Sequence, residues 1–124
     1  MQKLLLIEDD PEVRRHVQEA LEEAGYQVLT ATEGHEGLRL LDTHSVDLVL
    51  VELRIPGMDG LDLVRMLHRT RRRAKIIAIA GAVWDWQYLA VYRGAHMTLQ
   101  KPFSREMLLE TVRTQLSSTE SGSF

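Results

Sequence analysis

Short apolar runs alternate along this chain with longer segments in which apolar residues recur at helical spacing. The runs, each of strand length, lie at residues 4–7, 26–31, 48–51, 75–80 and 97–99. The first and third runs consist only of Leu, Ile and Val, a composition typical of strands that are buried on both faces of a parallel sheet. The pattern therefore predicts five strands of a parallel sheet.

The segments between and after these runs predict five helices. They are expected at residues 11–24, 36–42, 60–69, 83–92 and 105–116. Inward-facing positions are expected at Val13, Val17, Ala20, Leu21 and Ala24 in the first helix and at Leu61, Val64 and Leu67 in the third. Residues suited to N-terminal caps precede three of the helices, at Asp10, Asp59 and Ser104.

Strands that alternate with helices predict an α/β fold with a parallel sheet. Right-handed crossovers leave few topologies, and a chain of 124 residues suits the doubly wound, flavodoxin-like (βα)5 sandwich with strand order 2-1-3-4-5. We expect one domain over residues 1–116 and a frayed, Ser-rich tail over residues 117–124. Such a tail suits either a stand-alone domain or a fragment of a longer protein.

Composition excludes several classes of protein. The chain has no cysteine, which rules out disulfides and thiolate metal sites. Its net charge of -3 gives no general reason to bind nucleic acid or a membrane surface, and no helix-turn-helix pattern is visible. No apolar run is long enough to span a bilayer or to form a signal peptide. We therefore expect a cytoplasmic domain without membrane contact or direct nucleic-acid binding.

Acidic residues stand at the ends of two runs that this topology makes neighbours. Glu8, Asp9 and Asp10 follow the first run, and Glu52 ends the third. Their strands lie side by side in the expected order, so these acids converge where open parallel sheets bind ligands. Clustered carboxylates favour a hard cation such as Mg²⁺. Lys101 follows the last run at the same edge, either as a structural ion-pair partner or as a cation that binds a phosphoryl group.

Three motifs together resemble a known family. They are Leu-Leu-Leu-Ile-Glu-Asp-Asp-Pro at residues 4–11, Asp-Leu-Val-Leu-Val-Glu-Leu-Arg-Ile-Pro-Gly-Met-Asp-Gly at residues 47–60 and Gly-Ala-His-Met-Thr-Leu-Gln-Lys-Pro-Phe at residues 94–103. With them, nearly the whole chain resembles the CheY-like receiver domain of two-component response regulators. Receivers accept a phosphoryl group from a histidine kinase onto an Asp at the end of the third strand, with Mg²⁺ bound beside it.

The resemblance implies a role for each residue of the acidic pocket. Glu8 and Asp9 correspond to the acid pair of receivers, and Asp9 to the direct metal ligand. Glu52 stands at the phospho-acceptor position, and Lys101 matches the lysine that receivers carry after the last strand. The resemblance also implies that Glu52 and the backbone carbonyl of Arg54 are candidate metal ligands.

Three positions depart from the family pattern. The acceptor position holds Glu52, whose side chain is one methylene longer than that of Asp, and phosphoryl transfer depends on close positioning. Ala80 replaces the Thr or Ser that hydrogen-bonds the phosphoryl group. Thr98 replaces the Tyr or Phe that swings inward on activation. The resemblance therefore implies an atypical receiver in which the standard switch is altered.

Two modes of action remain open for such a domain. In one, the Glu52 carboxylate mimics the charge of a phosphorylated Asp, pairs with Lys101 and holds a single signalling state. In the other, the pocket is unused and the domain is a dimerisation or docking module. A conventional Mg²⁺-dependent phospho-accepting receiver is the alternative. A flavodoxin-like cofactor binder is disfavoured, because the acidic loop at Glu8 would repel phosphate, and no nucleotide-binding or hydrolase motif is present to suggest an enzyme.

Two further segments bear on partners. Aromatic residues crowd one segment, at Trp84, Trp86, Tyr88 and Tyr92, and exposed aromatics mark interfaces. In receivers, the face of the fourth helix, fifth strand and fifth helix mediates homodimers and output contacts, so we expect a histidine kinase, another signalling protein or a second copy as partner. The second segment is a basic run at residues 69–75, interpreted as a solvated connector or a contact for an acidic partner.

Overall fold

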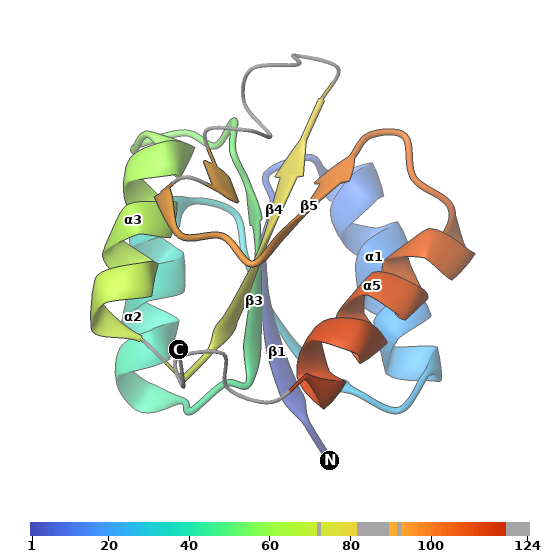
Figure 1. Ribbon diagram of the computed structural model, residues 1–124. Helices are drawn as coiled ribbons and strands as arrows, with labels where there is room; N and C mark the ends of the chain where they lie inside the picture. The colour runs from blue at the N-terminus through green and yellow to red at the C-terminus, as the bar shows by residue number, and fades with distance from the viewer. Residues whose placement is uncertain (72, 82–89, 92, 119–124) are drawn as a thin grey trace.

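The computed structural model describes residues 1–71, 73–81, 90–91 and 93–118. The elements are β1 (Lys3–Ile7), α1 (Pro11–Glu23), β2 (Gln27–Ala31), α2 (Gly34–Thr43), β3 (Leu48–Glu52), α3 (Gly60–Thr70), β4 (Lys75–Ala80), β5 (Met97–Gln100) and α5 (Arg105–Ser117) (Figure 1). All four strand pairings are parallel, and the sheet order is β2-β1-β3-β4-β5. The predicted α/β class and strand order are therefore confirmed.

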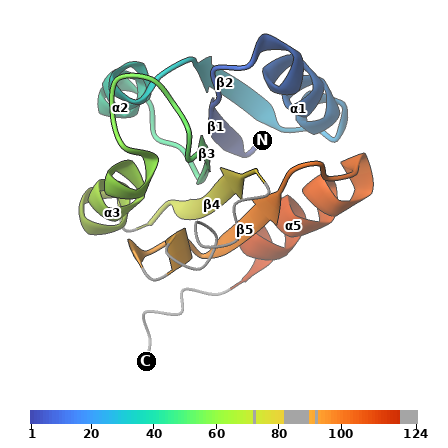
Figure 2. The same cartoon turned by 90° about the horizontal axis from the view of Figure 1, so that it is seen from above.

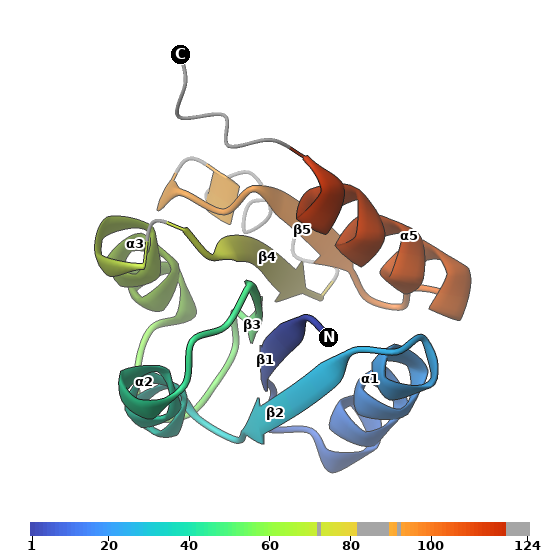
Figure 3. The ribbon, with the colours of Figure 1, turned by 90° about the horizontal axis from the view of Figure 1, so that it is seen from below.

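Two helical layers enclose the sheet. Helices α1 and α5 cover one face, and α2 and α3 cover the other (Figures 2 and 3). Successive side chains of a strand point to opposite faces, so Leu4 and Leu6 of β1 join the core under α1 and α5, while Leu5 and Ile7 join the core under α2 and α3. The wholly apolar runs are buried on both faces because each face is covered by helices.

The described residues contain four α-helices of the five expected. Most of the expected helix at residues 83–92, with Trp84, Trp86, Tyr88 and Tyr92, lies outside the described part of the chain. Helix α2 begins at Gly34, not at residue 36, because the Glu33 carboxylate caps it by accepting a hydrogen bond of 2.9 Å from the Glu36 N–H. Helix α5 extends to Ser117, one residue beyond the predicted end.

Two helical positions differ from the predicted inward faces. Ala24 is exposed, because it is the C-cap of α1 and no longer on the helical face. In α3 the fully buried residues are Leu63, Val64 and Leu67, whereas Leu61 is only partly buried. Leu61 lies in the first turn of the helix, at the edge of the core, and Leu63 faces the sheet directly.

The β3–α3 connection is a tight turn. Gly57 has a φ of 85°, a conformation that suits glycine. A side chain at Gly60 would collide with the backbone of Leu53, so the start of α3 packs directly on the residue that follows β3. Asp59 caps α3 as predicted, accepting a 2.8 Å hydrogen bond from the Leu61 N–H. This turn fixes the chain that leads away from Glu52.

Within the described residues, no helix combines the length and apolar character that crossing a bilayer requires.

Candidate functional site

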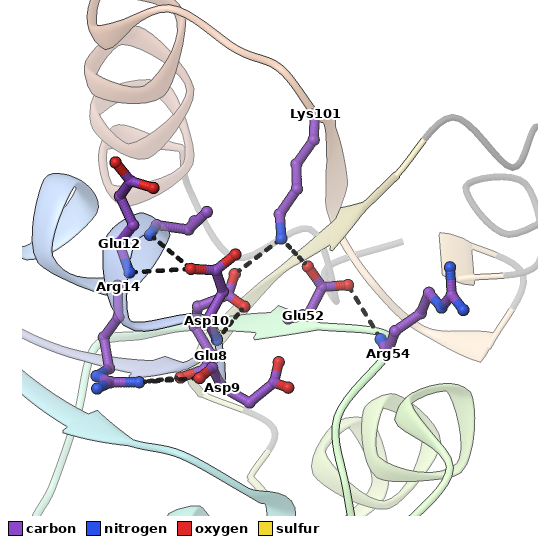
Figure 4. A network of polar contacts seen from close by, with 9 residues as sticks. Glu8, Asp9, Asp10, Glu12, Arg14, Glu52, Arg54 and Lys101 are labelled. Carbon is purple, nitrogen blue, oxygen red and sulfur yellow. Dashed lines mark hydrogen bonds and ion pairs between the residues drawn. The ribbon is translucent and has the colours of Figure 1, made fainter.

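Three ionisable residues meet at the carboxyl edge of the sheet. Glu8 directly follows β1, Glu52 is the last residue of β3, and Lys101 directly follows β5. The register pairs Ile7 with Val51, which places Glu8 and Glu52 side by side. The backbone N–H of Lys101 donates a 2.7 Å hydrogen bond to the Ala80 carbonyl at the end of β4. From there the Lys101 side chain extends toward the two acids (Figure 4).

The Lys101 ammonium lies between the two carboxylates. Its Nζ is 3.2 Å from Glu8 Oε1 and in closer contact with Glu52 Oε1. Glu8 is 0% exposed and Glu52 is 3% exposed, while the Lys101 side chain is 27% exposed. Buried charges are costly unless they are paired and hydrogen-bonded, so Lys101 compensates the charge of this pair of acids.

The second oxygen of each carboxylate bonds to the backbone. Glu52 Oε2 accepts a 3.0 Å hydrogen bond from the Arg54 N–H, and Glu8 Oε2 accepts one of 3.2 Å from the Asp10 N–H. The contact from Lys101 Nζ to Glu8 Oε1 has ion-pair distance but not hydrogen-bond geometry, so Glu8 Oε1 has no hydrogen bond from a described residue. Glu52 is therefore the better-satisfied acid of the two.

This environment shifts the pKa values of Glu8 and Lys101. Burial raises the pKa of Glu8, and the nearby Glu52 charge adds to this; the Asp10 N–H and the Lys101 ammonium oppose it without reversing it. Burial lowers the pKa of Lys101, but the hydrogen bond that its ammonium donates to Glu52 and the charges of both acids outweigh this effect, so the pKa is raised. Lys101 therefore stays protonated at neutral pH and serves as a permanent cation.

The structure places the other two acids of the predicted pocket outside this network. Asp10 caps α1: its Oδ1 accepts hydrogen bonds of 2.9 Å from the Glu12 N–H and 3.3 Å from the Val13 N–H. Asp9 is exposed, and its carboxylate forms no hydrogen bond or ion pair with the other residues labelled in Figure 4. The structure thus brings together Glu8, Glu52 and Lys101, and separates Asp9 and Asp10 from them by the direction of their side chains.

The resemblance to receiver domains implies a Mg²⁺ site beside the acids of this pocket. Among the described residues, no three His, Asp or Glu side chains are grouped closely enough to hold a metal ion. The position between the buried carboxylates is taken by the Lys101 ammonium. In this arrangement the cation shared by Glu8 and Glu52 is the Lys101 ammonium.

Arg14 supports the site in a way that sequence reasoning missed. Its Nη1 donates hydrogen bonds of 3.0 Å to the Glu8 carbonyl and 3.3 Å to the Asp9 carbonyl. The guanidinium thus holds the loop between β1 and α1 that carries the acids (Figure 4). The only sequence signal is its place in the second turn of a helix that starts directly after that loop.

The two other altered positions lie near this site. Ala80 is the last residue of β4 and fully buried, and its side chain offers no hydroxyl to the pocket. Thr98 is partly buried in β5 and pairs with Ala78. Thr98 has a hydroxyl but no aromatic ring.

Comparison with known proteins identifies the family. Residues 4–113 match the profile of the response regulator receiver domain. The chain is 34% identical over 114 residues to the transcriptional regulatory protein HprR of Escherichia coli K12, with 92% of this chain and 51% of HprR covered. It is 35% identical over 133 residues to CpxR of Klebsiella pneumoniae, with 99% and 56% covered. The chain thus spans about half the length of these relatives.

Solved structures agree with this assignment. A CheY-like receiver domain protein of Methanospirillum hungatei JF-1 superposes with a TM-score of 0.88 at 27% identity, covering 94% of both chains. A putative response regulator of Chloroflexus aurantiacus J-10-fl gives a TM-score of 0.89 at 25% identity, covering 94% of this chain and 98% of that one. From its sequence profile, its relatives and its fold, this chain belongs to the response regulator receiver domain family.

Proposed function

We propose that this chain is an atypical receiver that signals through protein–protein contacts, independently of phosphorylation at the end of β3. The observation that carries the proposal is the buried contact between the Glu52 carboxylate and the Lys101 ammonium. The acceptor position already holds a paired negative charge. In this proposal the domain is a signalling module and not an enzyme.

The hydrogen bonding of Glu52 argues against its use as a phosphoryl acceptor. Both of its oxygens have partners, Lys101 Nζ and the Arg54 N–H. An attacking oxygen must be in line with the leaving group, and a misplacement of about 1 Å costs about 10²-fold in rate. The extra methylene of Glu52 brings its carboxylate against the lysine, so a phosphoryl group attached there would have to displace that contact.

Two modes of action fit this pocket. In the first, the Glu52–Lys101 pair imitates the charge of a phosphorylated acceptor and holds one signalling state. In the second, the pair only stabilises the fold and the domain docks to its partners. The residues at positions 80 and 98 favour the second mode. Ala80 has no hydroxyl and Thr98 has no aromatic ring, the two groups through which receivers respond to charge at the acceptor position.

The proposed partners are a histidine kinase, another signalling protein or a second copy of this chain. Met97 on β5 and Met107 on α5 are large apolar residues left exposed on the last strand of the sheet and on the helix that follows it. Exposed apolar groups that gather on one side favour a protein interface there. This supports a homodimer or output contact through the face that β5 and α5 share.

A conventional Mg²⁺-dependent receiver is the second candidate. Glu8, Asp9 and Lys101 retain the types of side chain that receivers use. In this candidate Mg²⁺ would be held by Asp9, Glu52 and the Arg54 carbonyl. Both Asp9 and Glu52 would first have to rearrange, because one is exposed and the other is paired with Lys101.

Intact-mass measurement after incubation with Mg²⁺ and acetyl phosphate distinguishes the two candidates. We expect no phosphoryl adduct on the native chain and an adduct on Glu52→Asp, whose shorter side chain restores the acceptor. A variant with Glu52→Gln is the matched control, because it keeps the length of Glu52 and removes the nucleophile. A stoichiometric adduct on the native chain that Glu52→Gln abolishes would refute the proposal and support the conventional receiver.

A further inference from the structure

The outer side of α3 carries a row of exposed cations around an exposed methionine. The row consists of Arg65, Met66 and Arg69 on α3 and of Arg73 beyond its end, and is called the α3 stripe below. Arg65 and Arg69 are four residues apart and therefore neighbours on one side of the helix. Met66 is 40% exposed between them.

Acidic residues near the stripe are engaged elsewhere. Asp42 pairs with Arg71, with Nη2 and Oδ1 3.1 Å apart, and Asp62 lies 3.5 Å from Arg93 Nη1. Within the described part of the chain, the guanidinium groups of the α3 stripe form no ion pair. The stripe is thus a local positive patch on a chain whose net charge is -3.

The dipole of α3 explains only part of this patch. Cations stabilise the C-terminal turn of a helix, which accounts for Arg69. Arg65 lies in the middle of α3 and Arg73 lies beyond the C-cap at Arg71, where the dipole has little effect. A purely solvated face would also not need Met66, an adaptable apolar side chain that is common at binding surfaces.

A hollow of about 510 Å³ adjoins the end of the stripe. It lies between the connections that lead into β3 and β4, at the amino edge of the sheet, opposite the Glu8–Glu52 pocket. Leu41 and Ala74 provide apolar lining, and the ion pair of Asp42 and Arg71 also lines the hollow. Arg73 belongs both to the hollow and to the stripe. The cationic surface is therefore continuous with a recess that has room for side chains.

We propose that the α3 stripe and this hollow bind an acidic segment of a partner protein that carries an apolar side chain for Met66. The arginines, which form no ion pair with another described residue, match carboxylates, and the apolar side chain would cover the exposed methionine. A nucleic acid fits less well, because a long polyanion would extend beyond the stripe onto a chain whose net charge is -3, whereas a short acidic segment would not. The inference is independent of Glu52, whose pocket lies at the other edge of the sheet.

Amide NMR of the ¹⁵N-labelled chain tests the proposal with a defined probe. The probe is the blocked peptide Glu-Glu-Leu-Glu-Glu, and its matched control is Gln-Gln-Leu-Gln-Gln. We expect the glutamate peptide alone to shift the amides of residues 61–70 and 73–74, with an affinity that falls as salt rises. Equal shifts from the glutamine peptide, or shifts confined to other elements, would overturn the proposal.

Charge-reversal variants locate the binding. We expect Arg65→Glu/Arg69→Glu to weaken binding of the glutamate peptide at least about tenfold, because repulsion replaces attraction. The control is Arg15→Glu/Arg113→Glu, which changes the net charge equally at exposed positions of α1 and α5, on the other side of the sheet. We expect the control to bind within about twofold of the native chain.

Two outcomes of this comparison would refute the proposal. If the control pair weakens binding as much as Arg65→Glu/Arg69→Glu, only the net charge matters and the stripe is no docking surface. If a single-stranded oligonucleotide shifts the same amides more strongly than the peptide at equal salt, the surface binds nucleic acid. The NMR spectra also report whether each variant is folded, so loss of binding is not confused with loss of structure.

Discussion

The Lys101 ammonium and the Glu52 carboxylate are in direct contact, and Glu52 is almost fully buried. Glu8 lies on the other side of the same ammonium. One cation therefore serves two buried acids, and the excess charge is carried by the acid with the poorer hydrogen bonding, Glu8. The stability of the fold should therefore depend on the charges of Lys101 and Glu8.

Replacing Lys101 removes the positive charge that pairs with both buried acids among the described residues. We expect Lys101→Met to lower the free energy of unfolding by about 2–3 kcal/mol, toward the lower end for a broken buried ion pair because Lys101 is partly exposed. Urea unfolding at neutral pH measures the change. Arg113→Met, at an exposed position of α5, is the control and is expected to change stability by less than about 0.5 kcal/mol. Equal stability of both variants would contradict a stabilising role of the pair.

Alkaline titration examines the same pair without altering the other residues. Burial lowers the pKa of Lys101, but the hydrogen bond and charges of the acids outweigh it and raise the pKa above 10.5. The stabilisation is therefore complete below pH 10.5 and is lost as the pH rises through the folded-state pKa. We expect the stability difference between the native chain and Lys101→Met to stay constant up to pH 10.5 and to shrink above it. A difference independent of pH throughout that range would show that packing, and not charge, is lost in the variant.

Glu8 also loses a stabilising effect as the pH rises, but in the acidic range. Burial raises its pKa above 4.5, so the folded chain holds this proton more tightly than the unfolded chain. The resulting stabilisation is present below pH 4.5 and is lost as the pH rises from there through the folded-state pKa. We expect Glu8→Gln to remove this loss, so that its stability relative to the native chain increases with pH over that window. Glu12→Gln, on the exposed first turn of α1, is the control, and the same rise in both variants would exclude Glu8 as its origin.

Magnesium should stabilise the native chain very little. The Lys101 ammonium lies where a divalent ion would meet both buried carboxylates, and ligand binding raises stability only when the free concentration exceeds Kd. We expect about 10 mM Mg²⁺ to leave the thermal midpoint of the native chain unchanged and to raise that of Glu52→Asp, whose carboxylate is withdrawn from Lys101. A saturable rise for the native chain that is absent from an Asp9→Asn variant would instead indicate a metal site.

Arg14 is expected to stabilise the loop that carries the acids. Its guanidinium bonds to two carbonyls of that loop, and Arg14→Met would leave both without these donors. We expect a loss of about 1–2 kcal/mol in the free energy of unfolding, since the donor is charged but not fully buried. The neighbouring Arg15→Met is the control, because Arg15 is an exposed arginine of the same helix. Faster amide exchange at Asp9 and Asp10 in Arg14→Met alone would locate the effect.

Local sequence patterns were sufficient for the strands, their order and most helix starts. The runs at residues 4–7 and 48–51 are apolar at every position, and only a sheet covered on both faces buries such strands. Asp10, Asp59 and Ser104 cap their helices as predicted, because a cap depends on residues within one turn of it. The convergence of Glu8, Glu52 and Lys101 followed from the order of the strands.

The identity of the groups that touch inside the pocket depended on the tertiary structure. Glu8, Asp9 and Asp10 are consecutive, yet one is buried beside Lys101, one is exposed and one caps α1. Their side-chain directions depend on how the chain turns from β1 into α1, and Arg14 helps to hold that turn. The three acids carry the same charge and are adjacent in the sequence, so the sequence alone does not distinguish them. Their burial and their hydrogen-bond partners depend on the direction of the backbone, which is fixed only when the strands and helices pack together.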